Sequence, residues 1–233
     1  MITKIEASKR FLADHGWLKT HLLFSFADYQ DPNNVQFGNL RVFNDDVIAP
    51  GAGFPEHPHE NMEIVTIVLE GKLTHKDSIG NIGTINPGEV QHMTAGSGII
   101  HAEYNNSNHP VHLYQIWLFP REKNLTPTYG QKNFSNNFIK NKLLPIASGS
   151  EQEGAMKMQT EATIYVTELE TNNTISYVIP EKRGIFMYIQ SGNVLINNLD
   201  FISNDQARIV NEKEITITAQ ENSKFIMIEV LLN

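Results

Sequence analysis

Cysteine is absent from this 233-residue chain, so neither a disulfide nor a thiolate metal site can form. The sequence also lacks an uninterrupted apolar run of about 18 residues or more, the length that a membrane-spanning helix requires. The first twenty residues mix basic and acidic side chains and contain no apolar stretch followed by a small-residue cleavage site. We therefore expect no membrane span, no signal peptide and a cytoplasmic location.

Positive charge is scarce as well. Lysine and arginine number 18 against 26 for aspartate and glutamate, which gives a formal net charge of −8. No cluster of lysine and arginine forms the basic stripe that attracts a phosphate backbone, so direct binding of nucleic acid is disfavoured. The hydrophobic share of 40% is ordinary for a globular protein, and the length suits two domains.

Long helical periodicity is missing, and short β-branched or aromatic segments take its place. Between residues 63 and 96 such segments are separated by turns that contain glycine, and residues 163–232 repeat this rhythm. Residues 120–156 are polar and rich in proline, glycine, serine and asparagine, which predicts a connector. The pattern predicts an all-β protein built from two units that hide their sheet edges by pairing or closure.

All nine histidines precede Leu113, so whatever histidine does here depends on the first half of the chain. His57 and His59 are two positions apart, and so are His101 and Glu103. Alternate residues of a strand point to the same face, so each pair would project two side chains in one direction. Pro58 keeps the preceding His57 extended, and its missing N–H is tolerable at a sheet edge.

Three neutral imidazoles and one carboxylate suit a divalent first-row metal and leave two positions of an octahedral ion open. The residual positive charge would favour a substrate with an acidic hydroxyl group. An isolated H-x-H is more often a surface feature than a ligand pair, but two such pairs in one β unit favour the metal site. Glu63 shares the strand parity of His57 and His59, so it competes with Glu103 as the ligand or accepts a ligand histidine's second N–H.

The other histidines and a pair of aspartates receive simpler interpretations. We expect Asp45 and Asp46 to be turn and strand-end residues. Polar strand positions near the site are expected for His75 and His92, and structural or surface roles for His15, His21, His109 and His112.

The segments HPH (57–59), VLEG (68–71), MTAGSGIIHAEYN (93–105) and HLYQIW (112–117) resemble the pirin family of the cupin superfamily, especially its bacterial quercetin 2,3-dioxygenases. The resemblance implies an all-β bicupin of two jelly-roll β-barrels, with a metal-binding barrel in residues 1–135 and a barrel without metal ligands in residues 136–233. It implies that the metal ligands are His57, His59, His101 and Glu103. Glu63 stays the alternative carboxylate, and His92 departs from the bulky apolar residue that the family often has there.

The resemblance also implies an activity: a metal-dependent dioxygenase that opens a flavonol such as quercetin with release of carbon monoxide. Its partners would be a small aromatic substrate and dioxygen, with Glu103 as the catalytic base. Iron is the metal that we predict first, while manganese, nickel, copper, cobalt and zinc are compatible with the ligands. We expect a monomer.

Two alternatives remain open at this point. The chain could be a non-catalytic, metal-binding regulator that binds a protein partner, because fold does not determine function. The metal could also serve only to stabilise the barrel, in a closed four-coordinate site. An apolar cavity that reaches the metal and can hold a tricyclic ring would favour the enzyme, whereas a closed site with an exposed apolar patch would favour the regulator.

Overall fold

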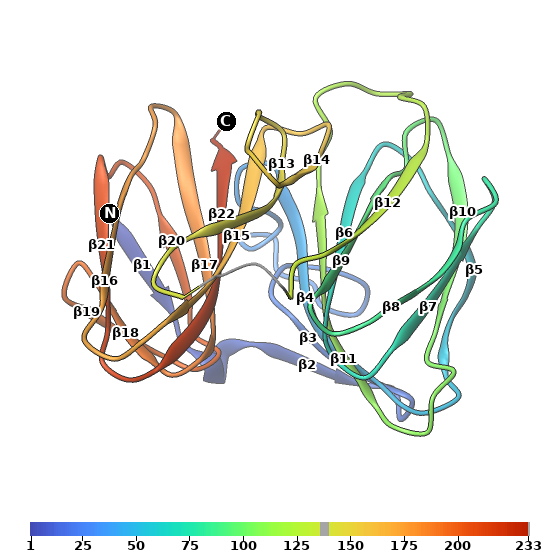
Figure 1. The fold of residues 1–233 in the computed structure, drawn as a ribbon, viewed down its shortest axis with the longest axis horizontal. Coiled ribbons are helices and arrows are strands. Elements are labelled where there is room, and N and C mark those ends of the chain that lie inside the picture. Colours follow the sequence, from blue (N-terminus) through green and yellow to red (C-terminus); the bar gives the residue numbers. More distant parts are fainter. Residues whose placement is uncertain (136–139, 233) are drawn as a thin grey trace.

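The structure is a computed structural model that describes residues 1–135 and 140–232. In these residues the chain forms four β-sheets, and the one helical segment among them is a short 3-10 turn, Ala7–Lys9. No helix in the described part of the chain is long and apolar enough to cross a membrane. The four sheets lie as four layers, with the two larger sheets in the middle (Figure 1).

The first half of the chain supplies one large and one small sheet, here called the N-terminal unit. The large sheet consists, in spatial order, of β12 (Thr128–Asn133), β9 (Glu89–Thr94), β6 (Glu63–Glu70), β11 (Val111–Leu118), β4 (Leu40–Ile48), β3 (Leu18–Leu22) and β2 (Phe11–Asp14). The small sheet consists of β5 (Gly53–His59), β10 (Ile99–Tyr104), β7 (Leu73–Asp77) and β8 (Ile82–Ile85).

The second half repeats this arrangement as the C-terminal unit. Its large sheet consists of β1 (Ile2–Ile5), β20 (Gln206–Ile209), β17 (Arg183–Ser191), β22 (Ser223–Leu231), β15 (Ala162–Leu169), β13 (Leu144–Ser148) and β14 (Met156–Lys157). Its small sheet consists of β16 (Thr174–Val178), β21 (Glu214–Ala219), β18 (Asn193–Ile196) and β19 (Leu199–Ile202). The predicted all-β bicupin is confirmed, although in the described residues each unit is a pair of facing sheets and not one closed barrel.

Two segments lie where the sequence pattern did not place them. The N-terminal strand β1 pairs with β20 of the C-terminal unit, where Ile2 packs against the apolar core (Figure 1). Residues 120–156, predicted as a connector, carry β12 and β13 and reach β14. β12 shows no apolar alternation because it is the half-exposed edge of its sheet. The division at residues 135 and 136 falls between β12 and β13 and stays a prediction.

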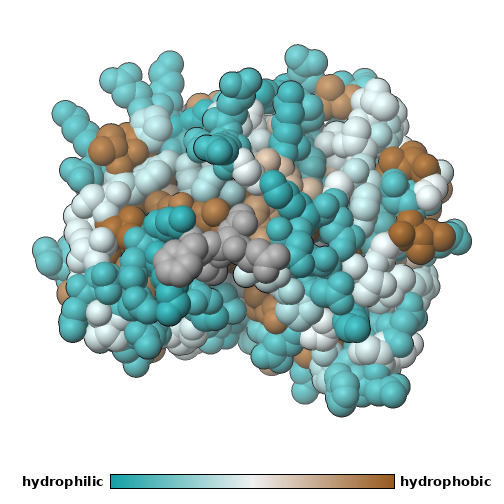
Figure 2. Space-filling model, in the orientation of Figure 1, coloured by the Kyte–Doolittle hydropathy of each residue, from teal (hydrophilic) through white to brown (hydrophobic). Residues whose placement is uncertain are grey.

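The two large sheets face each other across the largest apolar core. Phe43 of β4 lies 5.3 Å from Phe186 and 5.1 Å from Tyr188 of β17, measured between ring centroids. All three side chains are fully buried. Hydrophilic side chains cover much of the face seen in Figure 2, where hydrophobic ones form small separate groups. Because Phe43, Phe186 and Tyr188 are buried between the two large sheets, the contact between the units is part of the folded core.

Shortening Phe186 to leucine is expected to lower the free energy of unfolding by about 1–2 kcal/mol, because the smaller side chain leaves a cavity between the sheets. Urea denaturation measures the change. Val178→Ala is the control, since Val178 is 70% exposed and should shift stability by less than about 0.5 kcal/mol. Equal stability of the Phe186→Leu variant and the unmodified protein would contradict a shared core.

The interiors of the two units differ, and this difference positions the site. The space between the sheets of the C-terminal unit is filled by buried aliphatic and aromatic side chains, among them Ile185, Met187 and Phe201. In the N-terminal unit the apolar cluster around Leu73 and Leu113 is smaller, and histidines and polar groups occupy the remaining space. A ligand site can therefore form inside the N-terminal unit.

Candidate metal centre

Two neighbouring strands of the small sheet bring the predicted histidines together. β5 carries His57 and His59, and β10 carries His101, which lies directly opposite His57. The ring centroids are 4.4 Å apart for His57 and His101, and 4.9 Å apart for His59 and His101. One ring nitrogen of each of the three histidines lies within 4.8 Å of the others, and a single ion could bind all three.

A β-bulge on β5 turns two side chains toward the same cavity. Residues His101 and Glu103 of β10 pair with His57 and Phe54, so two steps along one strand match three steps along the other. The bulge lets Phe54 and His57 line one cavity despite their odd spacing. Pro58 is exposed, and β5 is the edge strand of its sheet, as predicted for a residue without an N–H.

The hydrogen bonds of the histidines suit a metal ligand set. The carbonyl oxygen of Pro55 accepts a bond from Nδ1 of His57 at 2.7 Å, which places the proton on Nδ1 and leaves Nε2 free. Nε2 of His101 is buried and has no hydrogen-bond partner in the part of the chain that the structure describes. Burial lowers the pKa of His59 to about 4 and that of His101 to about 2, so both rings are neutral at pH 7.

His75 and Asp77 of β7 orient His101 from behind. The Asp77 carboxylate accepts a hydrogen bond from Nε2 of His75 at 3.2 Å, so Nδ1 of His75 carries the lone pair. That atom is 3.5 Å from Nδ1 of His101, which leaves Nε2 of His101 for the ligand cavity. Glu63 therefore does not accept a hydrogen bond from a ligand histidine as the alternative prediction had it, and the carboxylate behind His101 is Asp77, which acts through His75. The alternation His75-x-Asp77 on one strand was the sequence signal for it.

Replacing His75 with alanine is expected to weaken metal binding roughly ten- to hundredfold, because an outer partner of a ligand fixes its tautomer and orientation. Competition with a chromophoric chelator measures the metal affinity. Exchange of the exposed His109 for alanine is the control. Unchanged affinity in the His75→Ala variant would show that His101 needs no outer partner.

Glu103 is buried beside this cluster. Gln115 donates from Nε2 to one carboxylate oxygen at 3.0 Å, and the hydroxyl of Thr66 lies 3.5 Å from the other. Burial raises the pKa of Glu103 to about 7. Glu103 shares a second group of ligand atoms, all within 4.8 Å of one another, with His75 and His101. His101 therefore groups with His57 and His59 on one side and with His75 and Glu103 on the other, and within the described residues no single group contains all four predicted ligands.

Glu63 lies on the face of the large sheet that points away from the metal centre and toward the C-terminal unit. Its carboxylate accepts hydrogen bonds from Nε2 of His92 at 2.8 Å, from the hydroxyl of Thr94 and from the backbone N–H of Gln159 in the C-terminal unit. The parity argument from His59 to Glu63 fails because the intervening turn, with Asn61 at a φ of 50°, interrupts the strand. His92 consequently belongs to the contact between the units.

Asp45 and Asp46 lie inside β4, so their expected positions at a turn and a strand end are wrong. Both are buried, on opposite faces of the strand. Asp45 faces the C-terminal unit, where its carboxylate binds Arg10 at 3.2 Å and accepts a bond from the hydroxyl of Tyr188 at 2.7 Å. Asp46 faces the interior of the N-terminal unit. Buried carboxylates in a strand cannot be recognised from residue type, since aspartate usually marks turns.

The ion pair between Asp45 and His112, 2.6 Å apart, predicts a pH dependence of stability. The hydrogen bond to Asp45 raises the pKa of His112 above 6.5. Burial opposes ionisation of Asp45, but the hydrogen bonds from His112 and Tyr188 outweigh it and lower its pKa below 3.8. The histidine stabilises the fold fully below pH 6.5 and loses this effect as the pH rises through its folded-state pKa, whereas the aspartate loses its effect as the pH falls through its own.

Both contributions are therefore complete between pH 3.8 and pH 6.5. Urea midpoints at about pH 5.5 and about pH 8.5 are expected to differ more for the unmodified protein than for His112→Gln, which cannot titrate. Equal differences in the two proteins would contradict a stabilising pair.

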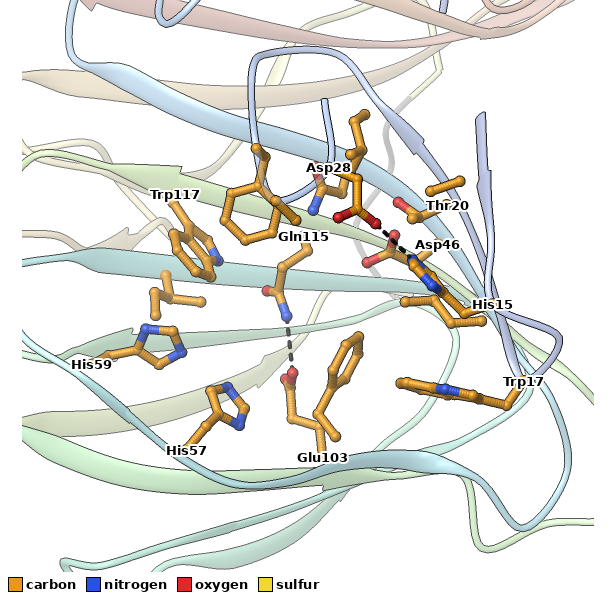
Figure 3. Close-up of a pocket in the computed structure, with 18 of the residues that line it drawn as sticks. His15, Trp17, Thr20, Asp28, Asp46, His57, His59, Glu103, Gln115 and Trp117 are labelled. Carbon is orange, nitrogen blue, oxygen red and sulfur yellow. Dashed lines mark hydrogen bonds and ion pairs between the residues drawn. The ribbon is translucent and has the colours of Figure 1, made fainter. Parts of the chain in front are cut away.

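The histidines and Glu103 open onto a cavity of about 410 Å³ inside the N-terminal unit (Figure 3). Aromatic side chains form much of its wall: Trp17, Phe26, Phe54 and Trp117. Trp117 lies edge-on to His59, with ring centroids 4.8 Å apart. His15, predicted as a structural or surface residue, lies at this cavity as well and is 4.0 Å from Asp28. A flat aromatic molecule would fit between these walls and reach the histidines.

Comparison with known proteins agrees with the fold. Residues 5–118 match the Pirin family, and residues 145–230 match the quercetinase C-terminal cupin domain. A pirin-like protein of Caulobacter vibrioides is 42% identical over 93% of this chain and 94% of its own. A quercetin 2,3-dioxygenase of Escherichia coli K12 is 40% identical over 99% of both chains. The crystal structure of the Escherichia coli bacterial pirin YhhW in complex with nickel(II) covers 100% of both chains at 38% identity, with a TM-score of 0.95.

Proposed function

Because this chain belongs to the pirin family, we propose that it is a metal-dependent dioxygenase that opens the ring of a flavonol such as quercetin and releases carbon monoxide. The observation that carries the proposal is the position of the three imidazoles at the wall of an aromatic cavity. Its volume of about 410 Å³ lies in the range of small-molecule sites. A closed, purely structural metal site would lack such a cavity.

We assign the metal to His57, His59, His101 and Glu103, with iron as the first candidate. A bound divalent ion would act as a Lewis acid toward the flavonol 3-hydroxyl and as a template for the reactants. Support comes from the unpartnered Nε2 of His101 and from the neutral state of His59 and His101. The nickel(II) complex of a relative with 38% identity supports a divalent metal.

The side chains around the metal site would hold the substrate and take its proton. Glu103 is the base that we assign to the 3-hydroxyl, since a carboxylate at the cavity wall can accept that proton. Gln115 holds this carboxylate at 3.0 Å and keeps it aimed at the cavity. Phe54 and Trp117 in the cavity wall would confine the flat ring system and exclude water from the reacting hydroxyl.

Oxygen uptake with quercetin tests this function. Protein loaded separately with iron, manganese, nickel, copper, cobalt or zinc is expected to consume oxygen and bleach the flavonol absorption band with at least one metal. His57→Ala should abolish the activity, whereas His109→Ala, which changes an exposed histidine, should retain it. Binding of every metal without oxygen uptake or bleaching would overturn the proposal and point to the regulatory alternative.

A further inference from the structure

The cavity has a second polar end, away from the histidines. Asn44 and Asp46 of β4 point to the same face, and Thr20 of β3 pairs with Asp46 across the sheet. Asp46 is 3% exposed and Asn44 is 6% exposed. Figure 3 shows Asp46 and Thr20 on the opposite side of the cavity from His57 and His59, with Gln115 and Glu103 between the two ends.

The oxygen atoms at this end lack partners. The Oδ1 atoms of Asn44 and Asp46 and the hydroxyl oxygen of Thr20 are buried and have no hydrogen-bond partner within residues 1–135 and 140–232. Buried polar atoms of folded proteins nearly always have one, so an unpaired acceptor at a cavity wall indicates a site for a donor. The two Oδ1 atoms accept hydrogen bonds and the Thr20 hydroxyl can both donate and accept, which favours a ligand that brings hydroxyl groups over one that brings only carboxylates or phosphates.

We propose that Asn44 and Asp46 bind a hydroxyl group on an outer ring of the substrate, so that the cavity selects aromatic substrates with hydroxyl groups at both ends. This inference rests on the proposed function and deepens it: the 3-hydroxyl meets the metal end, and the outer hydroxyl meets β4. The substrate class is therefore a polyhydroxylated flavonol or a similar polyphenol.

The electrostatics of this end suit a neutral donor. Burial raises the pKa of Asp46 to about 7, and its carbonyl oxygen accepts a hydrogen bond in either protonation state. A cationic ligand would need a permanently ionised partner to offset the loss of its hydration. A phenolic hydroxyl carries no such cost, so it fits better than an ammonium group.

The test compares two ligands that share the metal-binding hydroxyl. Quercetin carries further hydroxyl groups on both outer rings, whereas 3-hydroxyflavone carries none. Their dissociation constants are measured by calorimetry without oxygen, on nickel(II)-loaded protein. We expect quercetin to bind roughly ten- to hundredfold more tightly than 3-hydroxyflavone, as for one or two hydrogen bonds in a buried site.

Asp46→Leu should remove most of this preference by weakening quercetin alone, and Asn44→Leu gives a second variant if the first does not fold. Asp46→Asn retains an acceptor oxygen and should retain the preference. Leu22→Val changes the same cavity without a polar atom and should affect both ligands equally.

The outcomes separate this inference from the proposed function. A preference that depends on Asp46, without oxygen uptake, would support the binding site and overturn only the dioxygenase. Oxygen uptake combined with equal weakening of both ligands would overturn the hydroxyl site and leave the dioxygenase intact. Equal affinity of the unmodified protein for both ligands, or failure to bind either, would also overturn the hydroxyl site.

Discussion

Replacing His101 with alanine is expected to lower metal affinity roughly a hundred- to thousandfold. Structural zinc sites with four ligands bind the metal with about 10–16 kcal/mol, so one ligand accounts for roughly a quarter of this, or about 2.5–4 kcal/mol. His101 is 1% exposed and belongs to both groups of ligand atoms. Its replacement by alanine leaves a buried gap, which a water molecule can fill only partly. The loss of metal affinity in His101→Ala should therefore exceed the loss in His75→Ala.

Competition with a chelator measures this loss, with metal content of the isolated protein as a second measurement. His109→Ala should match the unmodified protein because His109 is exposed outside the cluster. Full metal content and unchanged affinity in His101→Ala would refute the assignment of His101 as a ligand, because both groups of ligand atoms contain it.

Changing Glu103 to glutamine is expected to lower kcat about a hundred- to ten-thousandfold, the usual contribution of a general base. Glutamine keeps the size of the side chain and one acceptor oxygen for Gln115, so the cavity should keep its shape. It cannot accept the proton of the substrate hydroxyl. Oxygen uptake should therefore fall far more than the binding of quercetin.

The assay uses saturating metal, so that weaker metal binding is not mistaken for a loss of the base. Glu60→Gln is the matched control, since Glu60 is exposed just after β5. A kcat within about threefold of the unmodified value would exclude Glu103 as the base.

The Glu103 variant also bears on the hydroxyl site at the other end of the cavity. Asp46 and Glu103 face the same cavity, and burial is the main reason for the raised pKa of Asp46, to which the charge of Glu103 adds only a smaller part. Removing the charge of Glu103 should therefore leave Asn44 and Asp46 able to bind an outer hydroxyl. Preference for quercetin over 3-hydroxyflavone should persist in Glu103→Gln.

Local sequence patterns predicted the architecture well where one face of a strand is buried. Residues 63–96 form short strands as predicted, and the glycine-containing turns separate β6 to β9. β1 and β12 were not predicted, because edge strands bury few side chains and their apolar residues alternate only weakly. Which sheet an edge strand joins depends on contacts far along the chain, as the pairing of Ile2 with Ile209 shows.

The sequence by itself determined the chemistry available to this protein: histidines confined to the first half, two i, i+2 pairs, a proline that keeps one pair extended, and no thiolate. The tertiary structure alone decided which carboxylates serve the site. Glu63 faces the C-terminal unit, Asp77 lies behind His101 with His75 between them, and Asp46 lines the cavity. The physical reason is that strand parity holds only within a strand, whereas register, turns and bulges set which side chains meet across strands.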